Sequence, residues 1–182
     1  CSLCARAVFF GENMTELPCY HSDEEIREVA RRFEDCSYRP EEFHHAQHLT
    51  VIVWYLAQLG PEAALKKIRE ALLKFTKHYG KTAYHESITC FWVSTVNNHL
   101  RQTNRDGNLA AVANEVIERL GNKDLIYEHY SRDRIMSPEA KAEWVEPDLK
   151  PLSRGGADAT ASLRDTASRA RSLKWLICGR EG

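Results

Sequence analysis

The chain has 182 residues, which is long enough for one well-cored domain and short for two. Its formal net charge is -1 and its charged residues are interspersed, so it lacks the basic face with which proteins bind nucleic acid. The longest apolar run, residues 49–59, is shorter than the roughly 20 residues that cross a bilayer, so we expect no membrane span. No signal-peptide pattern opens the chain, which predicts a cytoplasmic location and reduced cysteines.

Apolar residues recur at helical spacing through most of the chain, and no segment has a convincing strand pattern. Ser22 is a good N-cap, and Pro40 and Pro61 suit the first turns of the next two helices. The predicted main helices span residues 23–35, 40–60, 61–80, 84–101 and 109–120. Two shorter helices are expected at residues 124–129 and 137–144. The sequence therefore predicts an all-α, single-domain bundle of about five main helices within residues 22–152.

Both ends of the chain are expected to lie outside this domain. Residues 1–21 form an N-terminal extension, and the part before Met14 can be sequence upstream of the native protein. Its Cys1-x-x-Cys4 and Cys19-x-His21 pairs have the ligand types of a zinc knuckle, but their irregular spacing argues against a zinc site. Residues 153–182 are rich in Ser, Ala, Gly and Arg, which predicts a flexible tail. The alternative for this tail is a weakly amphipathic helix near its middle.

Histidines lie on the apolar stripes of two of the predicted helices. His45 and His48, three residues apart, share the stripe of the second helix. His85 heads the stripe of the fourth helix, with Glu86 beside it. Because a buried imidazole loses its hydration, several in one interior suggest a metal ion or proton chemistry. We therefore expect the two helices to be neighbours and the histidine rings to converge.

These side chains match the ligands of a catalytic metal centre. Imidazoles from His45, His48 and His85 would leave one coordination position open for water or substrate. Nitrogen and oxygen ligands without thiolate suit a divalent zinc, iron, manganese or nickel ion, and the spacing does not choose among them. Glu86 is the candidate general base or fourth ligand.

Other assignments remain open at this level. His44 could replace His45 because it lies four residues before His48, although it would project about 100° away from the stripe. Glu42 is a second candidate carboxylate. A plainer interpretation is that the histidines cap helices or bond to loops.

Three motifs resemble those of a group of small, uncharacterised bacterial proteins of helical fold. They are Phe43-x-His45-x-x-His48-Leu49, Tyr84-His85-Glu86-Ser87-Ile88-Thr89, and the stretch from Tyr130-Ser131 through Trp144-Val145-Glu146-Pro147-Asp148-Leu149. The resemblance covers residues 25–152. It implies that His45, His48, His85 and Glu86 belong together, and it implies nothing about the substrate.

Two functions of different classes follow from these observations. The first is a metal-dependent enzyme acting on a small molecule, such as a hydrolase or an iron-dependent oxygenase. The second is a metal-free helical module that binds a ligand or a partner and uses its histidines for hydrogen bonds or pH sensing. The sequence does not indicate an oligomeric state.

Overall fold

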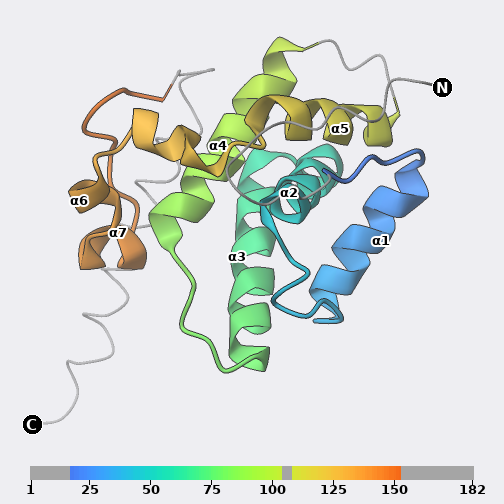
Figure 1. Ribbon diagram of the computed structural model, residues 1–182, viewed down its shortest axis with the longest axis horizontal. Helices are drawn as coiled ribbons and strands as arrows, with labels where there is room; N and C mark the ends of the chain where they lie inside the picture. Colours follow the sequence, from blue (N-terminus) through green and yellow to red (C-terminus); the bar gives the residue numbers. More distant parts are fainter. Residues whose placement is uncertain (1–16, 104–107, 153–182) are drawn as a thin grey trace, which may run out of the picture.

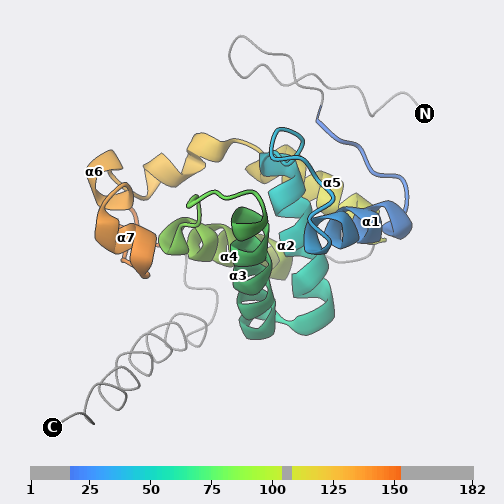
Figure 2. The ribbon, with the colours of Figure 1, turned by 90° about the horizontal axis from the view of Figure 1, so that it is seen from below.

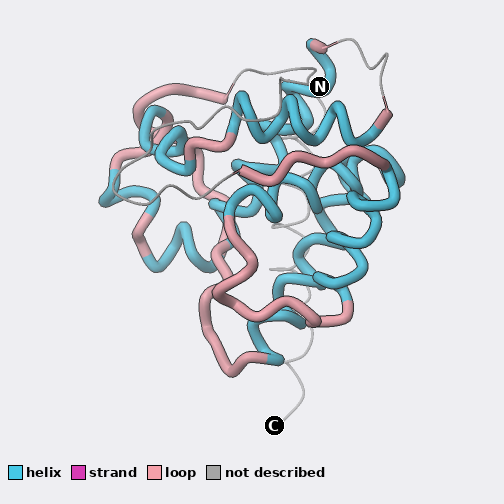
Figure 3. Tube along the Cα trace, turned by 45° about the vertical axis from the view of Figure 1, so that its right-hand side comes forward, coloured by secondary structure: helices cyan, strands magenta, loops and turns pink. Residues whose placement is uncertain are grey.

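The computed structural model describes residues 17–103 and 108–152, and in these ranges the regular elements are helices joined by loops (Figure 3). The main helices are α1 (Asp23–Glu34), α2 (His45–Leu59), α3 (Pro61–His78), α4 (Glu86–Gln102) and α5 (Leu109–Leu120). A 3₁₀ helix, η1 (Lys123–Glu128), and two short helices, α6 (Arg132–Ile135) and α7 (Pro138–Ala142), follow them. The predicted all-α domain with five main helices is confirmed.

Helix α2 is the centre of the bundle. It packs against α1, α3, α4 and α5, which surround it in Figure 1. Apolar residues lie on most sides of this helix, and Leu49 and Val53 are fully buried. A helix that is apolar nearly all round is stable only when neighbours cover it, which explains its central place. The predicted contact between the second and fourth main helices is confirmed, since α2 packs directly on α4.

Helix α2 begins at His45, so the predicted start at Pro40 is wrong. The residues before it form a turn in which the Glu42 amide donates to the Arg39 carbonyl at 2.9 Å. His44 then has extended backbone, with φ of -92°, and its amide donates to the Gln47 side chain at 3.0 Å. This side-chain bond from the first turn fixes the start of the helix.

Helix α4 begins at Glu86, two residues later than predicted. His85 has extended backbone, with φ of -141°, and its Nδ1 accepts a hydrogen bond from the Ile88 amide at 3.3 Å. His85 is therefore the N-cap, which satisfies a backbone donor that the first turn leaves unpaired. The expectation that it heads the inward stripe of the helix is wrong.

The loop between α3 and α4 is held at the end next to α3. Gly80 has a φ of +62°, a conformation that glycine adopts without strain, and the next amide, of Lys81, donates to the Thr76 carbonyl at 2.8 Å. The Tyr79 hydroxyl shares its one proton between the carbonyls of Cys36 and Tyr38, at 2.9 and 2.6 Å. This contact ties the start of the loop to the segment that joins α1 to α2.

The last described segment covers one end of α4. Figures 1 and 2 show α6 and α7 at this end, on the side of the molecule opposite α1. The buried Ser87 hydroxyl donates to the Glu143 carbonyl at 2.8 Å and accepts from the Val145 amide at 3.0 Å. The buried Tyr130 hydroxyl donates to the Val145 carbonyl at 2.7 Å. These bonds replace backbone hydrogen bonds that an irregular segment cannot make within itself.

Two sequence predictions concern parts of the chain that the structure leaves undescribed. Cys1 and Cys4 of the possible zinc knuckle, and the tail of residues 153–182, lie outside the described residues. Within those residues, no helix combines the length and apolar character needed to cross a bilayer.

Candidate functional site

A cavity of about 380 Å³ lies between α1, α2, α3 and α4. Its walls are mostly aromatic and aliphatic. Six aromatic side chains contribute to them: Phe33, Phe43, Phe75, Tyr79, Tyr84 and Trp92. The volume falls within the range of pockets that hold small molecules.

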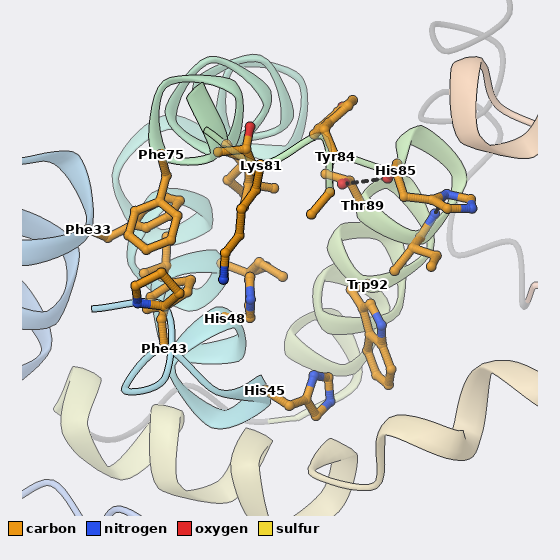
Figure 4. A pocket seen from close by; sticks show the side chains of 18 of the residues that line it. Phe33, Phe43, His45, His48, Phe75, Lys81, Tyr84, His85, Thr89 and Trp92 are labelled. Carbon is orange, nitrogen blue, oxygen red and sulfur yellow. Dashed lines mark hydrogen bonds between the residues drawn. The ribbon is translucent and has the colours of Figure 1, made fainter. Parts of the chain in front are cut away.

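Three phenylalanine rings form one wall of this cavity. Phe33 and Phe43 are stacked, with ring centroids 4.7 Å apart, and the Phe75 centroid lies 5.5 and 5.4 Å from those two. The three rings come from α1, from the segment before α2, and from α3 (Figure 4). Because they support one another from three directions, the wall is rigid and apolar.

His48 projects into the cavity from α2 (Figure 4). Its ring centroid lies 4.3 Å from that of Phe43, edge to face. Among the described residues, no side chain or backbone group makes a hydrogen bond with either of its ring nitrogens. Burial lowers the pKa of His48 to about 4, so its imidazole is neutral near pH 7. His48 is thus a neutral group with hydrogen-bonding capacity unused by the protein.

His45 lines the same cavity but is already bonded. Its Nε2 donates to the Leu120 carbonyl, at 3.2 Å, and its ring packs edge to face on Trp92 with centroids 4.3 Å apart. Burial lowers the pKa of His45, although the bond to this carbonyl opposes the shift. His45 therefore links the start of α2 to the end of α5.

His85 also borders the cavity, with both of its ring nitrogens in use. Its Nδ1 caps α4, and its Nε2 donates to the Ile135 carbonyl at 2.9 Å. Burial lowers its pKa, and the bond to Ile135 opposes the shift. In Figure 4 its ring is turned away from His48. The structure thus brings the three histidines to one cavity without turning their rings to a common point.

Glu86, the predicted base, lies outside this cavity in an ion pair with Arg69 of α3. Its carboxylate accepts hydrogen bonds from Arg69 and from the Tyr84 hydroxyl, and from the Cys90 thiol at 3.2 Å. Burial would raise the pKa of Glu86, but the bonds from Arg69 and Tyr84 outweigh burial and hold it below its usual value. The Glu86 carboxylate is thus occupied by three donors from the protein itself, which fits a structural role in joining α3 to α4.

The predicted metal ligands are therefore not gathered around one point. In residues 17–103 and 108–152, no three His, Cys, Asp or Glu side chains form a group that could hold a metal ion. The alternatives considered from the sequence do not change this, because His44 is exposed and Glu42 pairs with Arg39 at 2.6 Å.

The sequence prediction missed two features of the site. One is the phenylalanine wall, whose members have the same apolar spacing as ordinary core residues. The other is Lys81, which lies in the loop between α3 and α4 and lines the cavity although it is exposed to solvent. No motif surrounds it in the sequence.

Comparisons with protein-family models, with characterised proteins and with solved structures gave no match to this chain. The resemblance to a bacterial group therefore stays a prediction, and the function has to be argued from the geometry of the cavity.

Proposed function

We propose that this protein is a metal-free binding module for a small, largely apolar molecule held in the cavity among α1, α2, α3 and α4. The observation that carries the proposal is the His48 imidazole, which faces an aromatic cavity with no hydrogen-bond partner among the described residues. This imidazole therefore keeps hydrogen-bonding capacity that a molecule in the cavity can use. A ligand with an apolar body and one polar group would satisfy it.

The composition of the walls supports binding driven by apolar burial. Aliphatic side chains from α2, α3 and α4 complete the aromatic lining: Val51, Ile52, Ile68, Leu72 and Ile88. Pockets that bind small molecules combine such surfaces with a few polar groups that orient the ligand. The proposal does not include a reaction, because the carboxylate expected to act as a base is held in an ion pair.

Filling the cavity is expected to weaken binding. Leu72 lines the cavity, whereas Leu73, the next residue of α3, is 50% exposed and lies outside it. We expect Leu72→Trp to lower the affinity for the neutral dye N-phenyl-1-naphthylamine at least tenfold, because the indole takes up the space. Leu73→Trp should bind the dye like the wild-type protein.

Dye fluorescence, titrated with each protein, measures this difference. The thermal unfolding of both variants should be recorded beside it, since overpacking can cost about 1–3 kcal/mol. A wild-type protein that binds neither the dye nor another small apolar molecule, or equal binding of the dye by a folded Leu72→Trp variant, would refute the proposed function.

The metal-dependent enzyme expected from the sequence stays a prediction that metal retention can test directly. We expect protein reconstituted anaerobically with iron, and separately with zinc, manganese and nickel, to retain no stoichiometric metal after desalting, because His85 already uses both ring nitrogens. Elemental analysis measures the retained metal. Retention of one equivalent that His48→Ala removes would instead support the metal centre. The cytoplasmic location likewise stays a prediction.

A further inference from the structure

We infer that the ligand of this cavity is a small organic anion, such as a carboxylate with an apolar body, whose anionic group meets Lys81 and His48. This inference rests on the proposed function and specifies the chemical class of the ligand.

The first support is the charge of the cavity lining. Lys81 is the one lysine or arginine among the described lining residues, and no Asp or Glu lines the cavity. A cavity with a cation and no carboxylate attracts anions and disfavours cationic ligands. Glu86, the nearest acid to Lys81 along the chain, already forms its ion pair with Arg69.

The second support is the position of Lys81. The left-handed turn at Gly80 and the bond from the Lys81 amide to Thr76 place this residue at the solvent-exposed side of the cavity. In Figure 4 its side chain runs along the cavity, with the ammonium end directed toward His48. No acid among the described residues pairs with this ammonium group, although the arginines of α1 form ion pairs with neighbouring acids. Lys81 is therefore a cation that remains available to a ligand.

The third support is the chemistry of His48. A neutral imidazole always carries one N–H, and in His48 no described residue accepts from it. A carboxylate between this N–H and the Lys81 ammonium would receive two charge-assisted hydrogen bonds. Its hydrocarbon body would then extend toward the wall formed by Phe33, Phe43 and Phe75. One molecule would thus match the apolar wall and both polar groups.

Three probes with the same eight-carbon body test this assignment at neutral pH: octanoate, octanol and octylammonium. Calorimetric titration should give an affinity for octanoate roughly tenfold above that for octanol, as expected for charge-assisted bonds to one ligand group. Octylammonium should bind more weakly than octanol, because it would meet the charge of Lys81.

Substitution at the two polar positions should remove this preference. We expect Lys81→Met to lower octanoate affinity roughly tenfold and to leave octanol affinity within about twofold, and His48→Leu to act in the same direction. Lys77→Met is the matched control, because Lys77 is exposed on the neighbouring helix α3 and lies outside the cavity. It should leave the affinities for all three probes unchanged.

Each outcome separates this inference from the proposed function. Equal binding of octanoate and octanol, or an octanoate affinity that Lys81→Met does not change, would overturn the anionic class and leave the binding module intact. Binding of the neutral dye without binding of any eight-carbon probe would do the same. Absence of binding by both the dye and the three probes would overturn the proposed function together with this inference.

Discussion

Arg69→Met is expected to lower the free energy of unfolding by about 3 kcal/mol, the magnitude found when one partner of a buried ion pair is removed. The side chains of Arg69 and Glu86 are 25% and 13% exposed, so solvent screens this pair only in part. The substitution leaves the Glu86 carboxylate among neutral donors with no counter-charge. Urea unfolding followed by circular dichroism measures the loss.

A double variant distinguishes the pair from simple packing. Arg69→Met combined with Glu86→Leu removes both charges, so no buried charge is left unpaired, and the double variant should be more stable than Arg69→Met alone. If instead the two losses add, the ion pair does not join α3 to α4 in the way proposed. If Glu86→Leu alone leaves stability unchanged, Glu86 becomes available again as a candidate for chemistry.

Acidification is expected to destabilise the protein through His48. In the folded protein the pKa of His48 is about 4, below the usual value of 6.5 that applies to the unfolded chain. Between these values the unfolded chain binds a proton that the folded protein does not. The contribution of His48 to the free energy of unfolding is therefore fully present above pH 6.5 and falls as the pH approaches 4. Each unit of the difference corresponds to roughly 1.4 kcal/mol, so His48 accounts for a loss of about 3 kcal/mol.

The variant His48→Leu should lose less stability over this pH range than the wild-type protein. Some acid dependence should remain, because burial also lowers the pKa values of His45 and His85. Leu56→Ala is the matched control: it truncates a buried side chain of the same helix, at a cost of roughly 2–5 kcal/mol, and removes no titratable group. Unfolding free energies measured from neutral to acidic pH should therefore give parallel curves for Leu56→Ala and wild type. A His48→Leu curve parallel to theirs would contradict the assignment.

Most helix positions follow from local pattern in the sequence. The apolar spacing of α1, α3 and α5 marks the buried face of each helix, because a helix brings residues three and four apart onto one side. The same rule placed His45 and His48 on one face and predicted the contact with α4. These features depend on residues close together in the chain, so they can be read from it.

The role of His85 shows how a small local error changes a site. Because α4 starts at Glu86 instead of Tyr84, His85 lies outside the helix. The rotation of about 100° per residue, which sets side-chain directions within a helix, therefore does not apply to its ring. Its ring then finds the Ile135 carbonyl, which lies 50 residues away in the sequence. The spacing of apolar residues does not reveal an acceptor so far away in the chain. The sequence alone therefore predicted His85 as a metal ligand.

The sequence by itself determined that this protein is an all-helical domain with His45 and His48 on an inward face, because burial of apolar stripes follows from spacing. Only the tertiary structure decided what surrounds each polar side chain. It paired Glu86 with Arg69 of another helix, left His48 without a hydrogen-bond partner among the described residues, and brought Lys81 to the same cavity. The physical reason is that hydrogen bonds and charge pairs form between groups that meet in space, and their meeting depends on how all the helices pack together.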